Sequence, residues 1–212
     1  MKAEGRARDP DAPARSPWEI ALGDRLGELD PALRPYFSVI HLGYSGIGEG
    51  EFEQIGTPRR WLWPMLWVLG RLGIVYPLWA TDLPFEIRNS RPGDPADGIL
   101  NGLRYYRFHG SYRTMSDQIR FGPHGLVDRF ARGAIEMLFD ADVIEGHLEL
   151  RSKGAVLRVG KARIPIPFAP RVHLVERYDG ERQRVALTMD LPAIGRVYEY
   201  RGAFSYKVVS DR

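Results

Sequence analysis

The fold of this protein is decided by residues 196–208, RVYEYRGAFSYKV. From Tyr198 to Val208, every second residue is aromatic, aliphatic or glycine, whereas the residues between them include Glu199 and Arg201. An alternation with a period of two is typical of a β-strand with one face buried and the other in water. The stretch therefore predicts a long strand at the edge of an apolar core.

The same period of two extends back through most of the chain. Turn residues such as Gly122-Pro123 and Asp179-Gly180 separate short apolar runs, and no run of helical length interrupts them. The predicted strands cover about residues 83–87, 102–112, 113–121, 125–131, 134–141, 146–152, 155–161, 171–178, 183–190 and 196–208. Consecutive strands with tight turns favour an antiparallel sheet that is strongly curved or closed into a barrel.

The N-terminal part of the chain predicts helices. Ser16-Pro17-Trp18-Glu19 has the pattern of a capping box with proline at the first helical position. A second short helix is expected to start at Asp30-Pro31, and the glycine-rich residues 38–55 favour a bent strand or hairpin. We expect an α+β protein, a large curved antiparallel sheet or barrel-like shell with two or three N-terminal helices. A disordered tail of residues 1–15 would precede a single domain of residues 16–212.

The segment from Trp61 to Ala80, WLWPMLWVLGRLGIVYPLWA, is apolar on every face of a predicted helix over residues 60–74. It holds four of the five tryptophans. Such a helix is buried as core, covers a ligand pocket, or touches a membrane or partner. Arg71 and its neighbouring glycines interrupt the segment, so we reject a transmembrane span while a peripheral membrane contact stays open.

Composition excludes several classes of function. Lys and Arg total 30 against 27 Asp and Glu, without a polybasic block, so we expect no nucleic-acid partner. The chain has no cysteine, and its five histidines lack metal-ligand spacing, so neither a metal site nor a cofactor is predicted. The N-terminus lacks the apolar region of a secretory signal, which leads us to expect a cytoplasmic protein.

Charged side chains on apolar strand faces are the main candidates for a site. Asp117, Asp128 and Glu176 each alternate with apolar residues, and a buried carboxylate is costly unless it is paired or has a function. Arg107 and His109 share a face with apolar neighbours on a preceding strand. These five side chains could line one cavity, although salt bridges that tie the sheet together would also explain the carboxylates.

Two functions follow from this pattern. The first is binding of a hydrophobic small molecule or lipid between the curved sheet and the apolar helix of residues 60–79. The ligand-binding candidates are Trp61, Trp63, Trp67, Arg107, Asp128 and Tyr200. The alternative is a cofactor-independent isomerase, cyclase or lyase, in which Asp117, Glu176 and His109 transfer protons and Arg107 holds an anionic group.

Several motifs resemble the bacterial family catalogued as domain of unknown function 4166. They are Arg104-Tyr-Tyr-Arg-Phe108, Gly125-Leu-Val-Asp-Arg-Phe130, Ile164-Pro-Ile-Pro167, Ala169-Pro-Arg-Val-His-Leu-Val-Glu176 and Leu191-Pro-Ala-Ile-Gly-Arg-Val-Tyr-Glu-Tyr-Arg-Gly202. The resemblance covers roughly residues 18–206. The chain differs from the family in having Asp128 where glutamate is usual, and in the many tryptophans of residues 61–80.

The resemblance implies the fold rather than a reaction, because it carries no established catalytic residues. In the family, this domain is often fused behind a saccharopine-dehydrogenase-like domain, which is absent from these 212 residues. A third hypothesis is therefore a structural or interaction module that partners an oxidoreductase.

Overall fold

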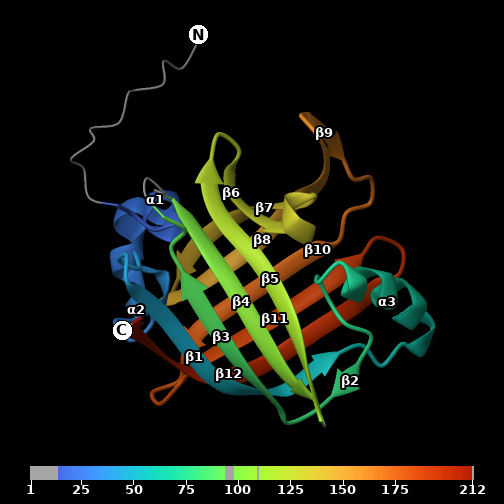
Figure 1. The fold of residues 1–212 in the computed structure, drawn as a ribbon, viewed down its shortest axis with the longest axis horizontal. Coiled ribbons are helices and arrows are strands. Elements are labelled where there is room, and N and C mark those ends of the chain that lie inside the picture. The colour runs from blue at the N-terminus through green and yellow to red at the C-terminus, as the bar shows by residue number, and fades with distance from the viewer. Residues whose placement is uncertain (1–13, 94–97, 109, 212) are drawn as a thin grey trace.

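The structure is a computed structural model that describes residues 14–93, 98–108 and 110–211. Figure 1 shows a shell of strands with short helices beside it. The helical elements are α1 (Pro17–Leu22), η1 (Gly23–Glu28), α2 (Arg34–Phe37), η2 (Arg60–Leu62), α3 (Trp63–Arg71) and η3 (Ala131–Gly133). The strands are β1 (Tyr44–Gly56), β2 (Trp79–Ala80), β3 (Leu83–Ser90), β4 (Ile99–Phe108), β5 (Ser111–Gly122), β6 (Gly125–Phe130), β7 (Ile135–Ile144), β8 (His147–Val159), β9 (Ala162–Pro165), β10 (Arg171–Tyr178), β11 (Gln183–Leu191) and β12 (Gly195–Ser210).

Ten of these strands form a closed antiparallel barrel. The order around the ring is β10, β11, β12, β1, β3, β4, β5, β6, β7 and β8, and the pairing of β8 with β10 closes it. β2 pairs with β1, and β9 pairs with the far end of β8, so both lie outside the ring. Because barrel diameter grows with strand number, ten strands enclose more space than their own side chains need to fill.

The structure confirms the antiparallel shell with a few short helices. Two strands predicted over 146–152 and 155–161 are one continuous strand, β8, and β9 was missed because its four residues are all exposed and show no alternation. The glycine-rich residues 38–55 contribute the single strand β1, with a bulge between Phe52 and Gln54. Most of the predicted tail, residues 1–13, lies outside the described residues.

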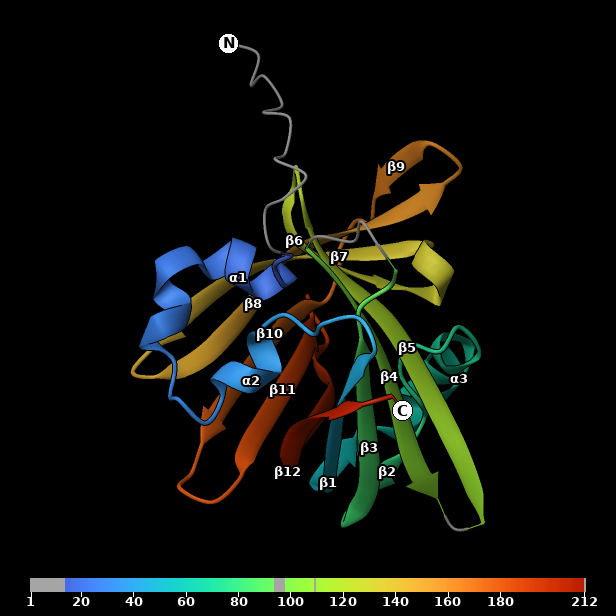
Figure 2. The ribbon, with the colours of Figure 1, turned by 60° about the vertical axis from the view of Figure 1, so that its left-hand side comes forward.

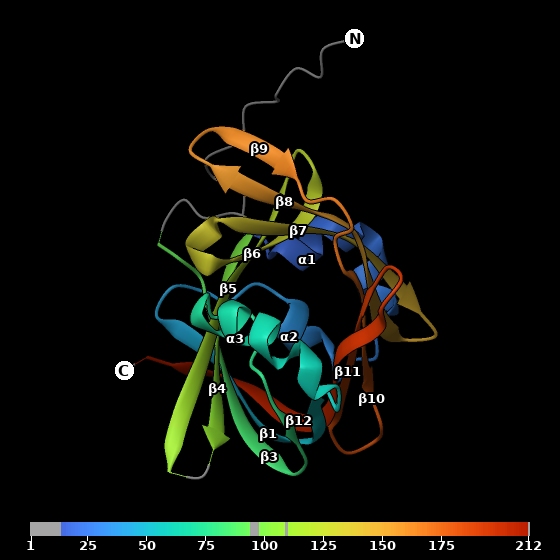
Figure 3. The same ribbon diagram turned by 90° about the vertical axis from the view of Figure 1, so that its right-hand side faces the viewer.

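The N-terminal helices cover one end of the barrel (Figures 1 and 3). The predicted capping box is present, since Ser16 accepts from the Glu19 amide and Glu19 accepts from the Ser16 amide. Ser16 also donates to the carbonyl oxygen of Phe37 at 2.5 Å, which joins the start of α1 to the end of α2. Trp18 and Phe37 meet edge to face, with ring centroids 5.4 Å apart. The two short helices therefore form one unit.

The opposite end of the barrel is covered by α3, which lies across the view in Figure 3. Leu66, on the inner side of this helix, is fully buried, whereas Trp61 and Trp67 are exposed. After the helix, the Tyr76 hydroxyl donates to the carbonyl oxygen of Thr114 on β5 and fixes the returning chain to the wall. Among the residues that the structure describes, no helix is long and apolar enough to cross a membrane.

Candidate functional site

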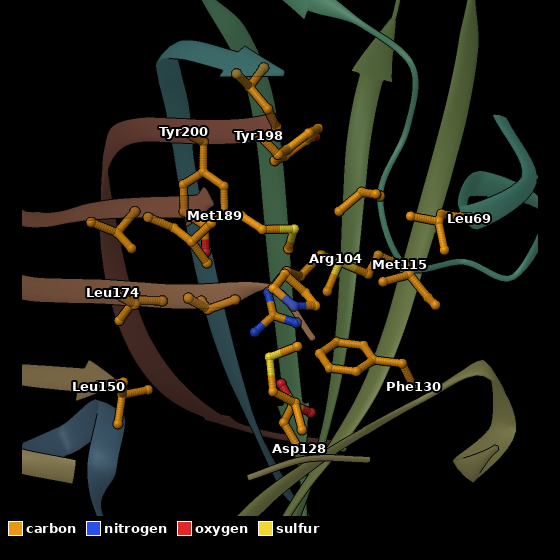
Figure 4. Close-up of a pocket in the computed structure, with 18 of the residues that line it drawn as sticks. Leu69, Arg104, Met115, Asp128, Phe130, Leu150, Leu174, Met189, Tyr198 and Tyr200 are labelled. Carbon is orange, nitrogen blue, oxygen red and sulfur yellow. The ribbon is translucent and has the colours of Figure 1, made fainter. Parts of the chain in front are cut away.

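A cavity of about 390 Å³ lies inside the barrel, between the wall and the covering helices. Its volume falls in the range of small-molecule sites. Most of its lining is aliphatic or aromatic because alternate residues of each strand point inward. The apolar lining includes Phe52, Phe85, Met115, Ile119, Phe130, Met137, Leu150, Leu174, Leu187 and Met189 from the strands, and Met65, Leu66 and Leu69 from α3. Figure 4 shows part of this lining around a small number of polar groups.

Arg104 on β4 carries the positive charge of the cavity. Its guanidinium donates a hydrogen bond to Asp117 on β5, whose side chain has no exposed surface. Gly102 lies opposite Asp117 in the register, and a Cβ there would be only 2.7 Å from the Asp117 carboxylate oxygen. Glycine at that position therefore makes room for the ion pair, which holds Arg104 pointing into the cavity (Figure 4).

Burial alone would lower the pKa of Arg104, but the charge of Asp117 and the nearby tyrosines Tyr36, Tyr106 and Tyr200 together raise that pKa well above its usual range. Arg104 thus stays charged at any physiological pH. Arg104 lines the cavity and Asp117 does not, so only the guanidinium is accessible from inside the barrel.

Asp128 on β6 is the second polar group of the cavity wall. Burial raises its pKa well above the ordinary value, and the nearby negative charge of Asp117 raises it further. Its Oδ1 atom is buried and has no hydrogen-bond partner among the described residues. A buried carboxyl group with an unpaired oxygen is a ready hydrogen-bonding site for a ligand.

Glu176 on β10 is the third polar group of the cavity wall. Gln183, at the start of β11, donates a hydrogen bond to it, and both residues are buried. Burial raises the pKa of Glu176 to about 7, even though Gln183 and the charge of Arg104 act in the opposite direction. This group therefore changes its charge near neutral pH.

Four tyrosines complete the polar part of the lining: Tyr36, Tyr106, Tyr198 and Tyr200. Burial raises the pKa of Tyr106 to about 12, and it raises the pKa of the other three as well. All four hydroxyls are therefore neutral. They give the apolar wall additional hydrogen-bonding groups without adding charge.

The structure brings together four of the residues singled out from the sequence, namely Asp117, Asp128, Glu176 and Tyr200. His109 lies outside the described residues. The predicted tryptophans take other positions: Trp61 and Trp67 are exposed, and Trp63 packs against the core without lining the cavity. The side of α3 that does line it carries leucine and methionine.

Arg107 lies on the outer face of β4, where it is exposed and stacks over Tyr112 at 5.7 Å. The interior arginine is Arg104, which sequence reasoning missed. β4 has apolar and aromatic residues on both faces, so alternation alone did not distinguish them. The available signal was Gly102, since a glycine two residues before an arginine on the same face leaves room for a buried partner.

These groups could bind a molecule with a long apolar body and a polar end. Arg104 would contact an acidic or carbonyl oxygen, while the Asp128 carboxyl group would form a second hydrogen bond. Within the described part of the chain, no three His, Asp or Glu side chains are grouped as metal ligands.

The fold and this site define a class: a closed antiparallel barrel that encloses an apolar cavity with a few buried polar groups. The chain belongs to the family described as domain of unknown function (DUF4166), whose sequence model matches residues 29–204. That match spans the barrel from the end of η1 to β12. No curated protein matches the chain.

Proposed function

We propose that this protein binds a hydrophobic small molecule or lipid with a polar end group, held in the cavity between the barrel wall and α3. The observation that supports this most directly is the unpaired Oδ1 atom of Asp128, buried in an apolar cavity of about 390 Å³. Leaving a buried polar atom unpaired costs about 1–3 kcal/mol, and a ligand that satisfied it would recover that energy. The charged Arg104 beside it favours a carboxylic acid or another oxygen-rich end group.

The test is native mass spectrometry of gently purified protein, followed by titration with a fluorescent long-chain fatty acid. We expect a copurified ligand, or binding of the probe that unlabelled fatty acid displaces. The decisive variant is Leu187→Phe, which adds volume to the cavity wall. Its matched control is Leu103→Phe on β4, at a position that does not line the cavity.

Circular dichroism would first show that both variants are folded. Leu187→Phe should then weaken probe binding at least tenfold, whereas Leu103→Phe should bind as the native protein does. The proposal would be wrong if no ligand copurified and no probe bound, or if the two variants bound equally well.

A second candidate function is a cofactor-independent isomerase, cyclase or lyase, and Glu176 favours it. A carboxyl group with a pKa of about 7 in an apolar cavity has the properties of a general base. Asp128, whose pKa burial raises well above its ordinary value, would be the acid. Two other residues were candidates for this role. Asp117 is hidden beneath Arg104, and His109 lies outside the described residues.

This candidate predicts proton exchange with the bound molecule. A ligand extracted after incubation in D₂O should carry deuterium at carbon, and Glu176→Gln should abolish that incorporation while leaving binding intact. Binding without any deuterium incorporation would rule out proton transfer at carbon and leave the protein as a carrier.

A further inference from the structure

The cavity opens on the side of the molecule that carries α3. Two segments contribute lining there: α3, through Leu66 and Leu69, and residues 166–170, which join β9 to β10. Phe168 in that loop lines the cavity although 80% of its surface is exposed, so it lies at the opening. Figure 3 shows α3 and β9 on this same side.

The rim of this opening is unusually apolar. Trp61 and Trp67 on the α3 side are 63% and 56% exposed. The arm formed by β9 and the end of β8 extends away from the barrel (Figure 2) and exposes further aliphatic side chains. Together the exposed apolar residues are Trp61, Met65, Trp67, Val68 and Leu72 around α3, and Leu157, Val159, Ile164 and Phe168 on the arm and its loop. Groups of exposed apolar residues mark interaction sites.

The rim is also basic. Residues 57–80 contain three arginines, residues 155–172 contain four Lys or Arg, and neither range contains Asp or Glu. Two of the arginines on the arm pair with the buried Glu136. In contrast, Arg71 and Lys161 form no ion pair within the described residues, and the Arg71 guanidinium lies 5.0 Å over the ring of Trp67.

We propose that the face formed by α3, the β8–β9 arm and residues 166–170 docks on an anionic phospholipid bilayer, with the cavity opening toward the lipid. Tryptophan with arginine or lysine is the combination found at the interface between membrane and water. An anionic surface attracts each nearby Lys or Arg, which complements two segments, residues 57–80 and 155–172, that contain no Asp or Glu.

The proposed function also favours a bilayer over a protein partner, and this part of the inference rests on the proposed function. A tightly bound protein would cap the opening and isolate the cavity. A bilayer instead holds apolar molecules at the depth that exposed tryptophans reach. Docking would thus place the entrance at the source of a hydrophobic ligand.

The experiment is cosedimentation of the full chain with vesicles of equal parts phosphatidylcholine and phosphatidylglycerol, and with vesicles of phosphatidylcholine alone. We expect binding to the mixed vesicles that weakens as salt is added, and quenching of tryptophan fluorescence by brominated lipid. Val68→Glu and Val159→Glu should each weaken binding at least tenfold, and Arg71→Gln roughly fivefold. The matched controls are Leu42→Glu and Arg177→Gln, exposed residues away from this face that should have no effect.

The outcomes separate this inference from the proposed function. Val68 and Arg71 do not line the cavity, so their variants should still bind the fatty-acid probe in solution. Probe binding without vesicle binding would overturn docking and leave the ligand proposal intact. Docking would also be overturned if the controls weakened binding equally, or if Val68→Glu instead abolished a dimer of the chain seen by analytical ultracentrifugation.

Discussion

At the scale of single residues, the cavity determines when its carboxyl groups ionise. The pKa of Glu176 rises from 4.5 to about 7 because the group is buried. The folded protein therefore holds this proton more tightly than the unfolded chain. The resulting stabilisation is complete below pH 4.5 and is lost as the pH rises through 7.

We predict that Glu176→Gln makes the free energy of unfolding less dependent on pH. In the native protein, Glu176 should lower the free energy of unfolding by about 3 kcal/mol between pH 4.5 and pH 8. Glutamine stays neutral and keeps the size of the side chain, so the variant should lose that part of the slope. Urea denaturation at a series of pH values measures it, with the exposed Glu51→Gln as the control. Equal slopes in the native protein and Glu176→Gln would contradict the prediction.

The pair formed by Arg104 and Asp117 supports a second prediction. Arg104→Met would leave a carboxylate without its counter-charge at a position with no exposed surface, and should cost about 3–5 kcal/mol of stability. Adding Asp117→Asn removes the uncompensated charge, so the double variant should be more stable than Arg104→Met alone. A thermodynamic cycle from urea denaturation gives the coupling. Purely additive losses would mean that the two side chains act independently.

The residues of the site were predictable where one face of a strand was clearly apolar. Asp128, for example, alternates with Leu126 and Phe130, and burial of those neighbours places it inside. Arg104 was not predictable in this way because Tyr105 and Tyr106 put aromatic rings on both faces of β4. The hydrogen bond between Gln183 and Glu176 depends on the register of β10 with β11, which alternation within one strand does not specify.

At the scale of elements, β1 is shaped by the strand beside it. Its inward positions include Gly46 and Gly48, and the rings of Tyr206 and Phe204 from β12 occupy the space where side chains would lie. A Cβ on Gly46 would overlap the Tyr206 hydroxyl. The glycines thus allow two aromatic residues to cross the inner face of the neighbouring strand.

Gly46→Ala should therefore destabilise the protein by about 1–3 kcal/mol, the usual cost of overpacking. Thermal unfolding followed by circular dichroism would measure the loss. Combining it with Tyr206→Leu removes the overlapping hydroxyl and should recover part of the stability. Gly122→Ala is the matched control, since nothing lies within 4 Å of a Cβ there. A similar loss from both single substitutions would show that backbone freedom matters more than the close approach.

The α3 segment shows why a helix can be predicted while its orientation is not. Nearly every residue from Trp61 to Leu72 is apolar, so the hydrophobic pattern has no polar side that would identify the exposed face. The structure turns Leu66 and Leu69 inward and leaves Trp61 and Trp67 outside. Only contact with the barrel distinguishes these faces.

At the scale of the whole molecule, the ring of strands is not equally strong around its circumference. The pairing of β8 with β10 joins only four residue pairs, from His173–Arg151 to Glu176–Leu148. It is the shortest pairing in the ring because β8 turns away after this point to pair with β9. We call this β8–β10 pairing the seam. It includes Glu176, which lines the cavity, so the seam borders the cavity.

Amide hydrogen exchange should reveal this difference. We expect residues 148–151 and 173–176 to exchange faster than the central residues of β1 and β12, because fewer bonds must break to open the seam. Mass spectrometry of peptides from the exchanged protein would locate the difference. Uniform protection around the ring would show instead that the barrel opens only by global unfolding.

The pairing of β1 with β12 has a consequence for how the protein is made. Residues 44–56 meet residues 195–210, so these two strands are far apart in the chain although they are neighbours in the ring. Contacts of this sequence separation form slowly, and the ribosome releases β1 long before β12 exists. During that interval β1 and β11 each have a bare edge that could pair with another nascent chain. The yield of native protein should therefore depend on chaperones that protect these edges until the last strand has been synthesised.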